Sequence, residues 1–137
     1  MIGPIGKDLA INDLAWWDGR LFAIDSNYPD GANLIEINPD TGAMISSVPV
    51  TIDGELAING IESIAADATG LIVGIWNGGS NPAISDNLGR LGLDGAVTDL
   101  QSFGTDLDGL SITSDGSLIS LDRDPLGPHI CPAHLLL

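Results

Sequence analysis

Short apolar runs follow one another along the chain, with polar residues at alternate positions and Gly, Asp or Pro between the runs. Three of the runs superpose when their first glycines are aligned, so that Leu21, Ile72 and Leu118 match: residues 19–25 (GRLFAID), 70–76 (GLIVGIW) and 116–122 (GSLISLD). A second apolar segment precedes each run, and a short polar turn such as Trp17-Asp18 joins the two. Two short apolar segments joined in this way predict a β-hairpin.

A second hairpin is predicted after the first in two of the three places. Residues 33–42 lead into 43–50, and residues 87–95 lead into 96–103. Pro39 presets φ for the second position of a turn, and Gly42 and Gly95 supply the positive φ that a bulged hairpin needs. Each unit therefore has four strands and recurs about every 50 residues, a spacing typical of β-propeller blades.

Three segments carry a nameable resemblance: residues 18–25 (DGRLFAID), 34–42 (LIEINPDTG) and 108–118 (DGLSITSDGSL). They resemble blades of bacterial β-propellers of the quinoprotein-like and NHL-like kind. The resemblance implies an all-β fold of consecutive four-stranded antiparallel blades in one domain, residues 1–137, with blades at about 9–50, 61–103 and, in part, 110–137. About two and a half blades do not close a propeller, which normally has four to eight.

An incomplete ring leaves an apolar blade face open at each end, and such faces favour association. Three explanations compete: the chain is a fragment of a longer protein that holds the remaining blades, it forms a homo-oligomer in which two copies complete a ring, or it stays an open arc. If the chain functions as given, we expect the homo-oligomer. The missing outer strands of the last blade would come from residues 130–137 or from residues 2–5 of a partner.

Charge narrows the range of partners. The chain of 137 residues has 19 acidic and 4 basic residues, a formal net charge of -15, and the basic residues Lys7, Arg20, Arg90 and Arg123 are widely scattered. Nucleic acids and anionic membranes attract clustered Lys and Arg, so both are excluded as partners. The chain also lacks a run of about 20 apolar residues that would span a membrane. With 44% hydrophobic residues it is expected to be a soluble, folded domain.

The residues suited to nucleophilic catalysis gather near the end of the chain. His129, Cys131 and His134 belong to the segment after Asp124, which reads as an irregular tail. A mobile terminus holds a nucleophile and a base in fixed geometry poorly, so we expect neither Cys-His catalysis nor a zinc site there. The chain has no histidine outside this segment. The rest of the chain therefore lacks the histidine that Ser-His or Cys-His catalysis needs, and carboxylate or metal-dependent catalysis remains.

An acidic residue stands at the start of the first strand of each unit: Asp13, Glu62 and Asp108. First strands line the central channel of a propeller, so these carboxylates would form a ring of the oxygen ligands that Ca²⁺ prefers. In gluconolactonase-like propellers a carboxylate at a similar place binds the catalytic metal, although the Asn and Asp partners of that site are not recognised here. The alternative is that these carboxylates accept hydrogen bonds from backbone N–H groups at turns.

The second strands of the units end at Asp25, Trp76 and Asp122, next to polar loops at 26–32 and 77–86. Trp76, followed by Asn77 and a loop rich in Gly and Asn, is suited to stack on a sugar or another flat ligand. The alternative is that Trp76 packs between blades.

Regular repeats without a repeated catalytic set favour a non-catalytic scaffold or ligand-binding module that acts as part of an assembled ring, without a cofactor. One alternative is a metal-dependent hydrolase of the lactonase type, with Ca²⁺ on Asp13, Glu62 and Asp108. The other is a truncated propeller fragment without independent activity.

Overall fold

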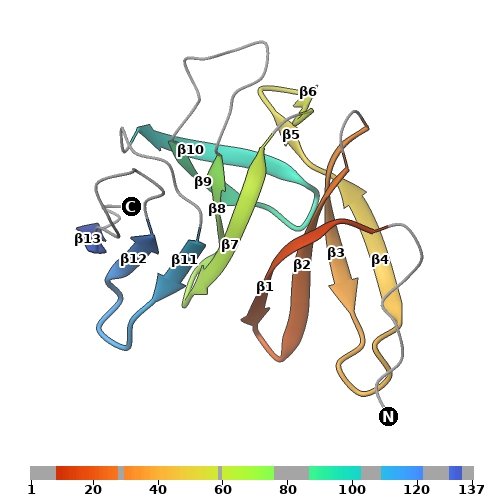
Figure 1. Ribbon diagram of the computed structural model, residues 1–137, viewed down its shortest axis with the longest axis horizontal. Coiled ribbons are helices and arrows are strands. Elements are labelled where there is room, and N and C mark those ends of the chain that lie inside the picture. Colours follow the sequence, from red (N-terminus) through yellow and green to blue (C-terminus); the bar gives the residue numbers. More distant parts are fainter. Residues whose placement is uncertain are drawn as a thin grey trace.

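The computed structural model describes residues 9–27, 30–58, 60–75, 87–102, 109–121 and 130–133. This part of the chain consists of strands and turns, arranged in three sheets that follow one another in an arc (Figure 1). The predicted all-β class is therefore confirmed. Within the described ranges, no helix is long and apolar enough to cross a membrane.

The first sheet contains β1 (Ile11–Trp17), β2 (Arg20–Asn27), β3 (Gly31–Ile37) and β4 (Met44–Pro49), in that order and antiparallel. Asp18 and Gly19 connect β1 to β2 with positive φ values of 50° and 72°, as a two-residue type I′ turn requires. Gly42, with φ of 76°, and a hydrogen bond of 2.8 Å from its N–H to the carbonyl of Asn38 shape the predicted turn between β3 and β4.

The second sheet contains β7 (Ile61–Asp67), β8 (Gly70–Ile75), β9 (Asn87–Leu91) and β10 (Ala96–Ser102), also antiparallel. A small hairpin of β5 (Thr51–Ile52) and β6 (Glu55–Leu56) extends its outer edge, because β5 pairs in parallel with β10. This hairpin was not predicted from the sequence. Its signal was the dipeptide Asp53-Gly54, whose φ values are both positive, as in a two-residue hairpin turn.

The third sheet contains β11 (Gly109–Ile112), β12 (Leu118–Leu121) and β13 (Ile130–Ala133). β13 pairs antiparallel with β12, and Cys131 lies opposite Ser120. Residues 130–133 of the same chain therefore form a further strand of the last sheet. The sequence had left two sources open for such a strand, residues 130–137 of the same chain or residues 2–5 of a partner. The expected irregular tail is wrong for these four residues, whereas His129 and His134 lie outside the described residues.

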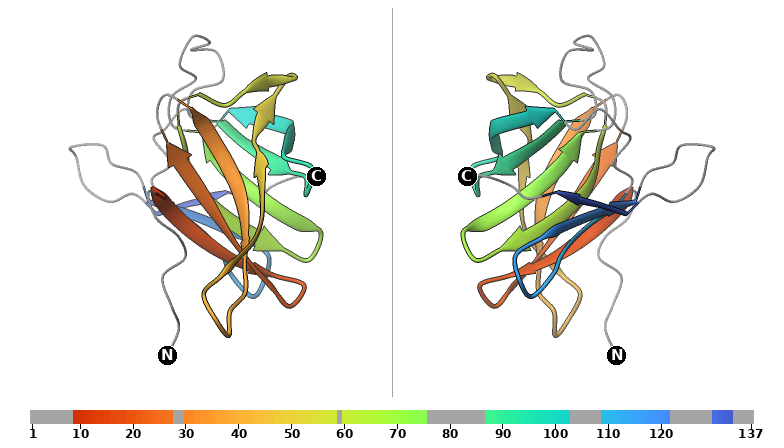
Figure 2. Two further views of the ribbon diagram at one scale, coloured as in Figure 1. Left: turned by 90° about the vertical axis from the view of Figure 1, so that its right-hand side faces the viewer. Right: turned by 90° about the vertical axis from the view of Figure 1, so that its left-hand side faces the viewer.

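Most of the apolar core fills the two seams, the contacts between neighbouring sheets. β7 lies between β1 and β11, so the first strands of the three sheets meet and the other strands radiate from them (Figure 1). In Figure 2, the first sheet faces the viewer in the left view, and the third sheet faces the viewer in the right view. The first seam buries Phe22, Ile24, Leu34, Ile64, Leu71, Val73 and Leu91, among others. The second seam packs Ile72 and Leu88 with Leu110, Ile112 and Leu118.

The two seams show that the sequence superposition of residues 70–76 is wrong by one residue. Gly19 and Gly116 lie in turns, whereas Gly70 is the first residue of β8 and matches Arg20 of β2. Leu71, not Ile72, therefore matches Leu118: each faces the preceding sheet, while Ile72 faces the following one. Successive strand residues point to opposite faces, so a slip of one residue exchanges the two faces of a sheet.

Candidate functional site

The first strands of the first two sheets carry the same β-bulge. In β1 the extra residue is Asn12, and in β7 it is Glu62. Asp13, the residue after the first bulge, therefore matches Ser63 rather than Glu62. In β11, Gly109 takes the same place through its pairing with Leu121. The assumption that Asp13 and Glu62 hold equivalent positions is thus wrong by one residue, because Glu62 is itself the extra residue of its bulge and matches Asn12.

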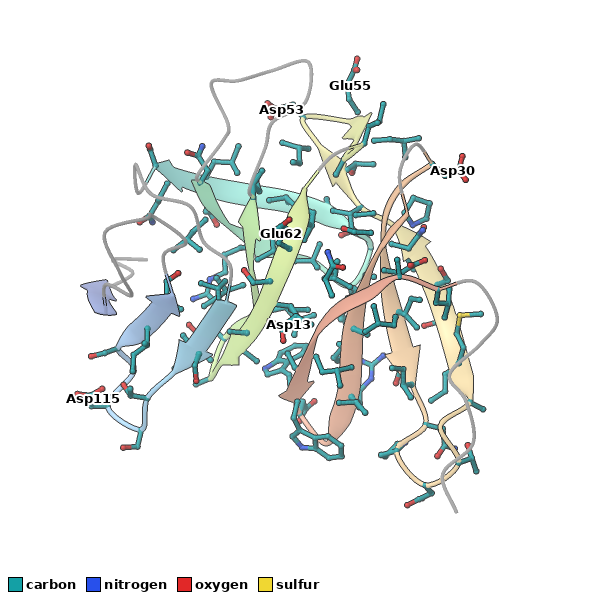
Figure 3. All side chains as sticks on the ribbon, in the orientation of Figure 1. Asp13, Asp30, Asp53, Glu55, Glu62 and Asp115 are labelled. Atoms are coloured by element: carbon teal, nitrogen blue, oxygen red, sulfur yellow. The ribbon has the colours of Figure 1, made fainter. Side chains whose placement is uncertain are left out.

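Asp13 joins the first two sheets (Figure 3). Its Oδ1 accepts a hydrogen bond from the N–H of Leu14 at 2.9 Å, and its Oδ2 accepts one from the N–H of Ile64 in β7 at 3.0 Å. Close by, the carbonyl of Ile61 accepts hydrogen bonds from Ser26 Oγ at 2.6 Å and from Asn12 Nδ2 at 3.4 Å. The bonds to Ile64 and Ile61 cross the seam, so the polar residues here hold neighbouring sheets together.

Two of the three residues of the predicted metal site, Asp13 and Glu62, belong to the part of the chain that the structure describes. Glu62 is half-buried on β7, and Asp108 lies outside the described residues. Within the part of the chain that the structure describes, no three His, Cys, Asp or Glu side chains gather closely enough to hold a metal ion. Calcium binding by Asp13, Glu62 and Asp108 stays a prediction.

Of the predicted ligand-binding residues, Asp25 is described, and Trp76, Asn77 and Asp122 lie outside the described residues. Asp25 is 4% exposed, and its Oδ1 accepts a hydrogen bond of 2.7 Å from the N–H of Ala10. It therefore fixes the chain just before β1. A ligand-binding role for Asp25 stays a prediction.

Sequence reasoning missed Asn87, the first residue of β9. Asn87 lies opposite Ile75 and is buried, and among the described residues its Oδ1 has no hydrogen-bond partner. A buried acceptor without a donor is unfavourable unless a further group supplies one. The signal in the sequence was a polar residue placed between the polar loop at 77–86 and an apolar strand.

Two ion pairs lie near the other ends of the sheets, where β1 turns into β2 and β7 into β8. Arg20 donates to both carboxylate oxygens of Glu36, at 2.8 and 2.7 Å, and its guanidinium lies 5.0 Å from the ring centroid of Phe22. Arg90 likewise donates to both oxygens of Asp67. The Arg90 guanidinium and hydrogen bonds from Thr69 hold the pKa of Asp67 well below its usual range. Both pairs are bidentate and fix sheet geometry.

Solved structures match this arrangement. The crystal structure of Myxococcus xanthus glutaminyl cyclase aligns with a TM-score of 0.60 at 17% identity, over 87% of this chain and 50% of that one. Kuenenia stuttgartiensis hydrazine synthase aligns with a TM-score of 0.52 at 14% identity, over 92% of this chain and 36% of that one. The chain has a β-propeller-like fold. No family model and no curated protein matches the sequence.

The propeller likeness is one of fold, and the chain spans only half the length of the glutaminyl cyclase and about a third of the hydrazine synthase chain. The three sheets are consecutive blades of an incomplete ring: the first blade is β1–β4, the second β7–β10 and the third β11–β13. The first blade therefore has one face without a neighbouring blade among the described residues.

That face, called the outer face below, consists of Leu14 and the row Trp16, Leu21, Ile37 and Met44. By strand pairing it matches residues of the second blade that pack in the first seam: the buried Ile64, Leu71, Leu91 and Val97 and the partly buried Ala66.

The matched positions differ in exposure at Leu14, Trp16 and Met44, whereas Ile37 is buried as Leu91 is. Leu14 and Met44 are each 48% exposed and Trp16 is 57% exposed, whereas Ile64 is 1% and Val97 6% exposed. The centre of the outer sheet surface is closed, because Leu9, Ile11 and Leu21 pack on Ala23, Ile35 and Ile37. The exposed residues of the outer face thus lie where a further blade would pack against the first blade.

Proposed function

We propose that the protein is a non-catalytic propeller-type scaffold or ligand-binding module that acts as part of an assembled ring. The outer face carries this proposal, because it exposes Leu14, Trp16 and Met44 at the places where the next blade buries its apolar residues. Covering apolar surface stabilises a protein by roughly 25 cal/mol per Å². A face of this kind therefore favours a further blade as its neighbour.

The polar residues of the first seam agree with a scaffold role. Asp13, Asn12 and Ser26 all bond across to β7, so these side chains serve the joint between blades. The two similar structures bear the names of two different activities, and a shared fold does not favour either activity for this chain.

We assign ligand binding to the end of the blades where β2 and β8 finish and β9 begins. Asp25, Trp76, Asn77 and Asp122 are the proposed binding residues, with the unpaired Oδ1 of Asn87 as a further acceptor. The test is retention on an array of immobilised oligosaccharides. Retention that Trp76→Ala abolishes and Leu93→Ala preserves supports the assignment, whereas retention that survives both Trp76→Ala and Asp25→Asn refutes it.

The ring itself is tested with the fluorescent probe anilinonaphthalene sulfonate, which brightens on exposed apolar surface, together with the solution mass. An isolated arc should bind the probe at the outer face, and Trp16→Glu should reduce this binding while Leu93→Glu does not, because Leu93 is exposed in the turn between β9 and β10. An assembled ring should instead have a higher mass. A folded single chain that binds no probe would contradict the proposal.

A further inference from the structure

We propose that a second copy of this chain covers the outer face with its third blade, so that two copies complete one ring. This inference depends on the proposed function and names the partner. It rests on how the first strands of neighbouring blades fit together.

In the second seam, the later blade contributes large side chains from its first strand and the earlier blade contributes small ones. β11 turns Leu110 and Ile112 toward the second blade, where Ser63 and Ala65 of β7 share the facing surface. Because protein interiors are close-packed, bulk on one side of a seam needs space on the other.

The first seam follows the same rule with one exchange. β7 turns Ile64 and Ala66 toward the first blade, where β1 presents Asp13 and Ala15. Trp17 is the large exception on β1, and it meets Gly70: a Cβ on that glycine would lie 3.9 Å from Trp17 Cζ2. The large Trp17 side chain is therefore matched with a residue that has no side chain.

The two open ends of the arc complement each other in the same sense. On the outer face, β1 presents Leu14 and Trp16 at the places of Ile64 and Ala66. The third blade turns Gly109, Ser111 and Ile119 away from the second blade, and these residues are called the free face below. The first strand thus presents large residues, Leu14 and Trp16, at one open end and small residues, Gly109 and Ser111, at the other.

The free face also continues the pattern of the second strands. Ile119 pairs with Ser111 as Phe22 pairs with Ala15 and Ile72 with Ala65, so it takes the place of two fully buried residues. Ser111 is exposed and Ile119 is partly exposed. A blade that docks here would bury an apolar second-strand residue, as in the other seams.

A second copy is the occupant that both faces favour. Each copy carries one outer face and one free face, so two head-to-tail contacts between two copies cover all four faces, and such contacts form closed rings when the rotations complete a turn. The match to glutaminyl cyclase covers 50% of that chain, so two copies of the arc correspond to its length.

The test is the mass of the folded chain by light scattering during size-exclusion chromatography. We expect twice the 14.1 kDa of one chain. Trp16→Glu on the outer face and Ser111→Lys on the free face should each halve the mass, whereas Leu93→Glu should not. Mixing the two variants should restore the doubled mass, because the new carboxylate then faces the new ammonium in one contact and the other contact is unaltered.

Each other outcome overturns the inference. A single-chain mass for the folded wild type excludes the second copy; if this chain binds the apolar probe, the ring proposal survives with another partner, and if it does not, both fail. A doubled mass that Ser111→Lys leaves unchanged means that another face meets the outer face. A doubled mass that persists in both Trp16→Glu and Met44→Lys excludes the outer face, and the second variant serves if the first lowers the melting temperature.

Discussion

Arg90 and Asp67 show how one residue pair stabilises a turn in this acidic chain. The guanidinium contacts both carboxylate oxygens, and the two side chains are 14% and 22% exposed. Thr69 adds hydrogen bonds to the same carboxylate from its N–H and its hydroxyl, at 2.7 and 2.8 Å. The sequence showed both residues, but their pairing depends on the register of β7, β8 and β9 and was not predictable from it.

Asp67 should make stability depend on pH. Its pKa is lowered in the folded state, so the unfolded chain binds the proton more readily, and the stabilisation is complete above the unfolded pKa of about 4. We expect Asp67→Asn to lower the free energy of unfolding by about 2 kcal/mol at pH 7. The difference from wild type should shrink as the pH falls below about 4. Urea unfolding at several pH values measures this; a difference that does not shrink in acid contradicts it, and Asp40→Asn is the exposed control.

A substitution at Asp13 distinguishes its two proposed roles, a hydrogen bond across the first seam and the binding of calcium. If Asp13 serves the seam, Asp13→Ala leaves the Ile64 N–H without its acceptor and lowers the free energy of unfolding by about 1 kcal/mol. The melting temperature should then be the same with calcium and with chelator. A rise with calcium that is lost in Glu62→Gln would instead favour the metal site. Asp30→Ala, at an exposed position, is the matched control.

At the scale of elements, turn chemistry was predictable and register was not. Pro39 and Gly42 predicted the turn between β3 and β4. The dipeptide Asp53-Gly54 is typical of a hairpin turn, but the β5–β6 hairpin was not predicted because its strands are too short to show alternating apolar residues. The bulges at Asn12 and Glu62 left no signal in composition, because a bulge is an extra residue whose effect appears only in the pairing of two strands. Without the strand pairing, Glu62 could not be recognised as the bulge residue that matches Asn12 rather than Asp13.

Substitutions at Gly54 and Gly95 distinguish the cost of backbone strain from the cost of a steric clash. Gly54 and Gly95 have φ values of 81° and 87°, but a Cβ on Gly54 meets nothing within 4 Å, whereas a Cβ on Gly95 would lie 2.1 Å from the carbonyl oxygen of Pro49. We expect Gly54→Ala to cost about 1 kcal/mol from the left-handed backbone alone. Gly95→Ala should cost about 3 kcal/mol, because overpacking adds to the strain. Equal urea midpoints for the two variants would refute this account.

At the scale of the whole molecule, charge and apolar surface oppose each other. Two copies that each carry a formal charge of -15 repel one another, while the outer face and the free face bring no charged side chain to the proposed contact. Sodium chloride screens the repulsion, since the Debye length falls from about 30 Å at 0.01 M to about 10 Å at 0.1 M. We expect the dissociation constant of the dimer to decrease with salt. An increase, measured by sedimentation, would indicate a contact held by ion pairs.

The incomplete ring is the central claim, and small-angle X-ray scattering of the chain tests it most directly. The predicted result is a particle of twice the mass of one chain, with the distance distribution of a closed ring built from two three-bladed arcs. Trp16→Glu should convert it to a single arc. A wild-type particle of single-chain mass that is folded and hides its apolar surface from the fluorescent probe would contradict the claim.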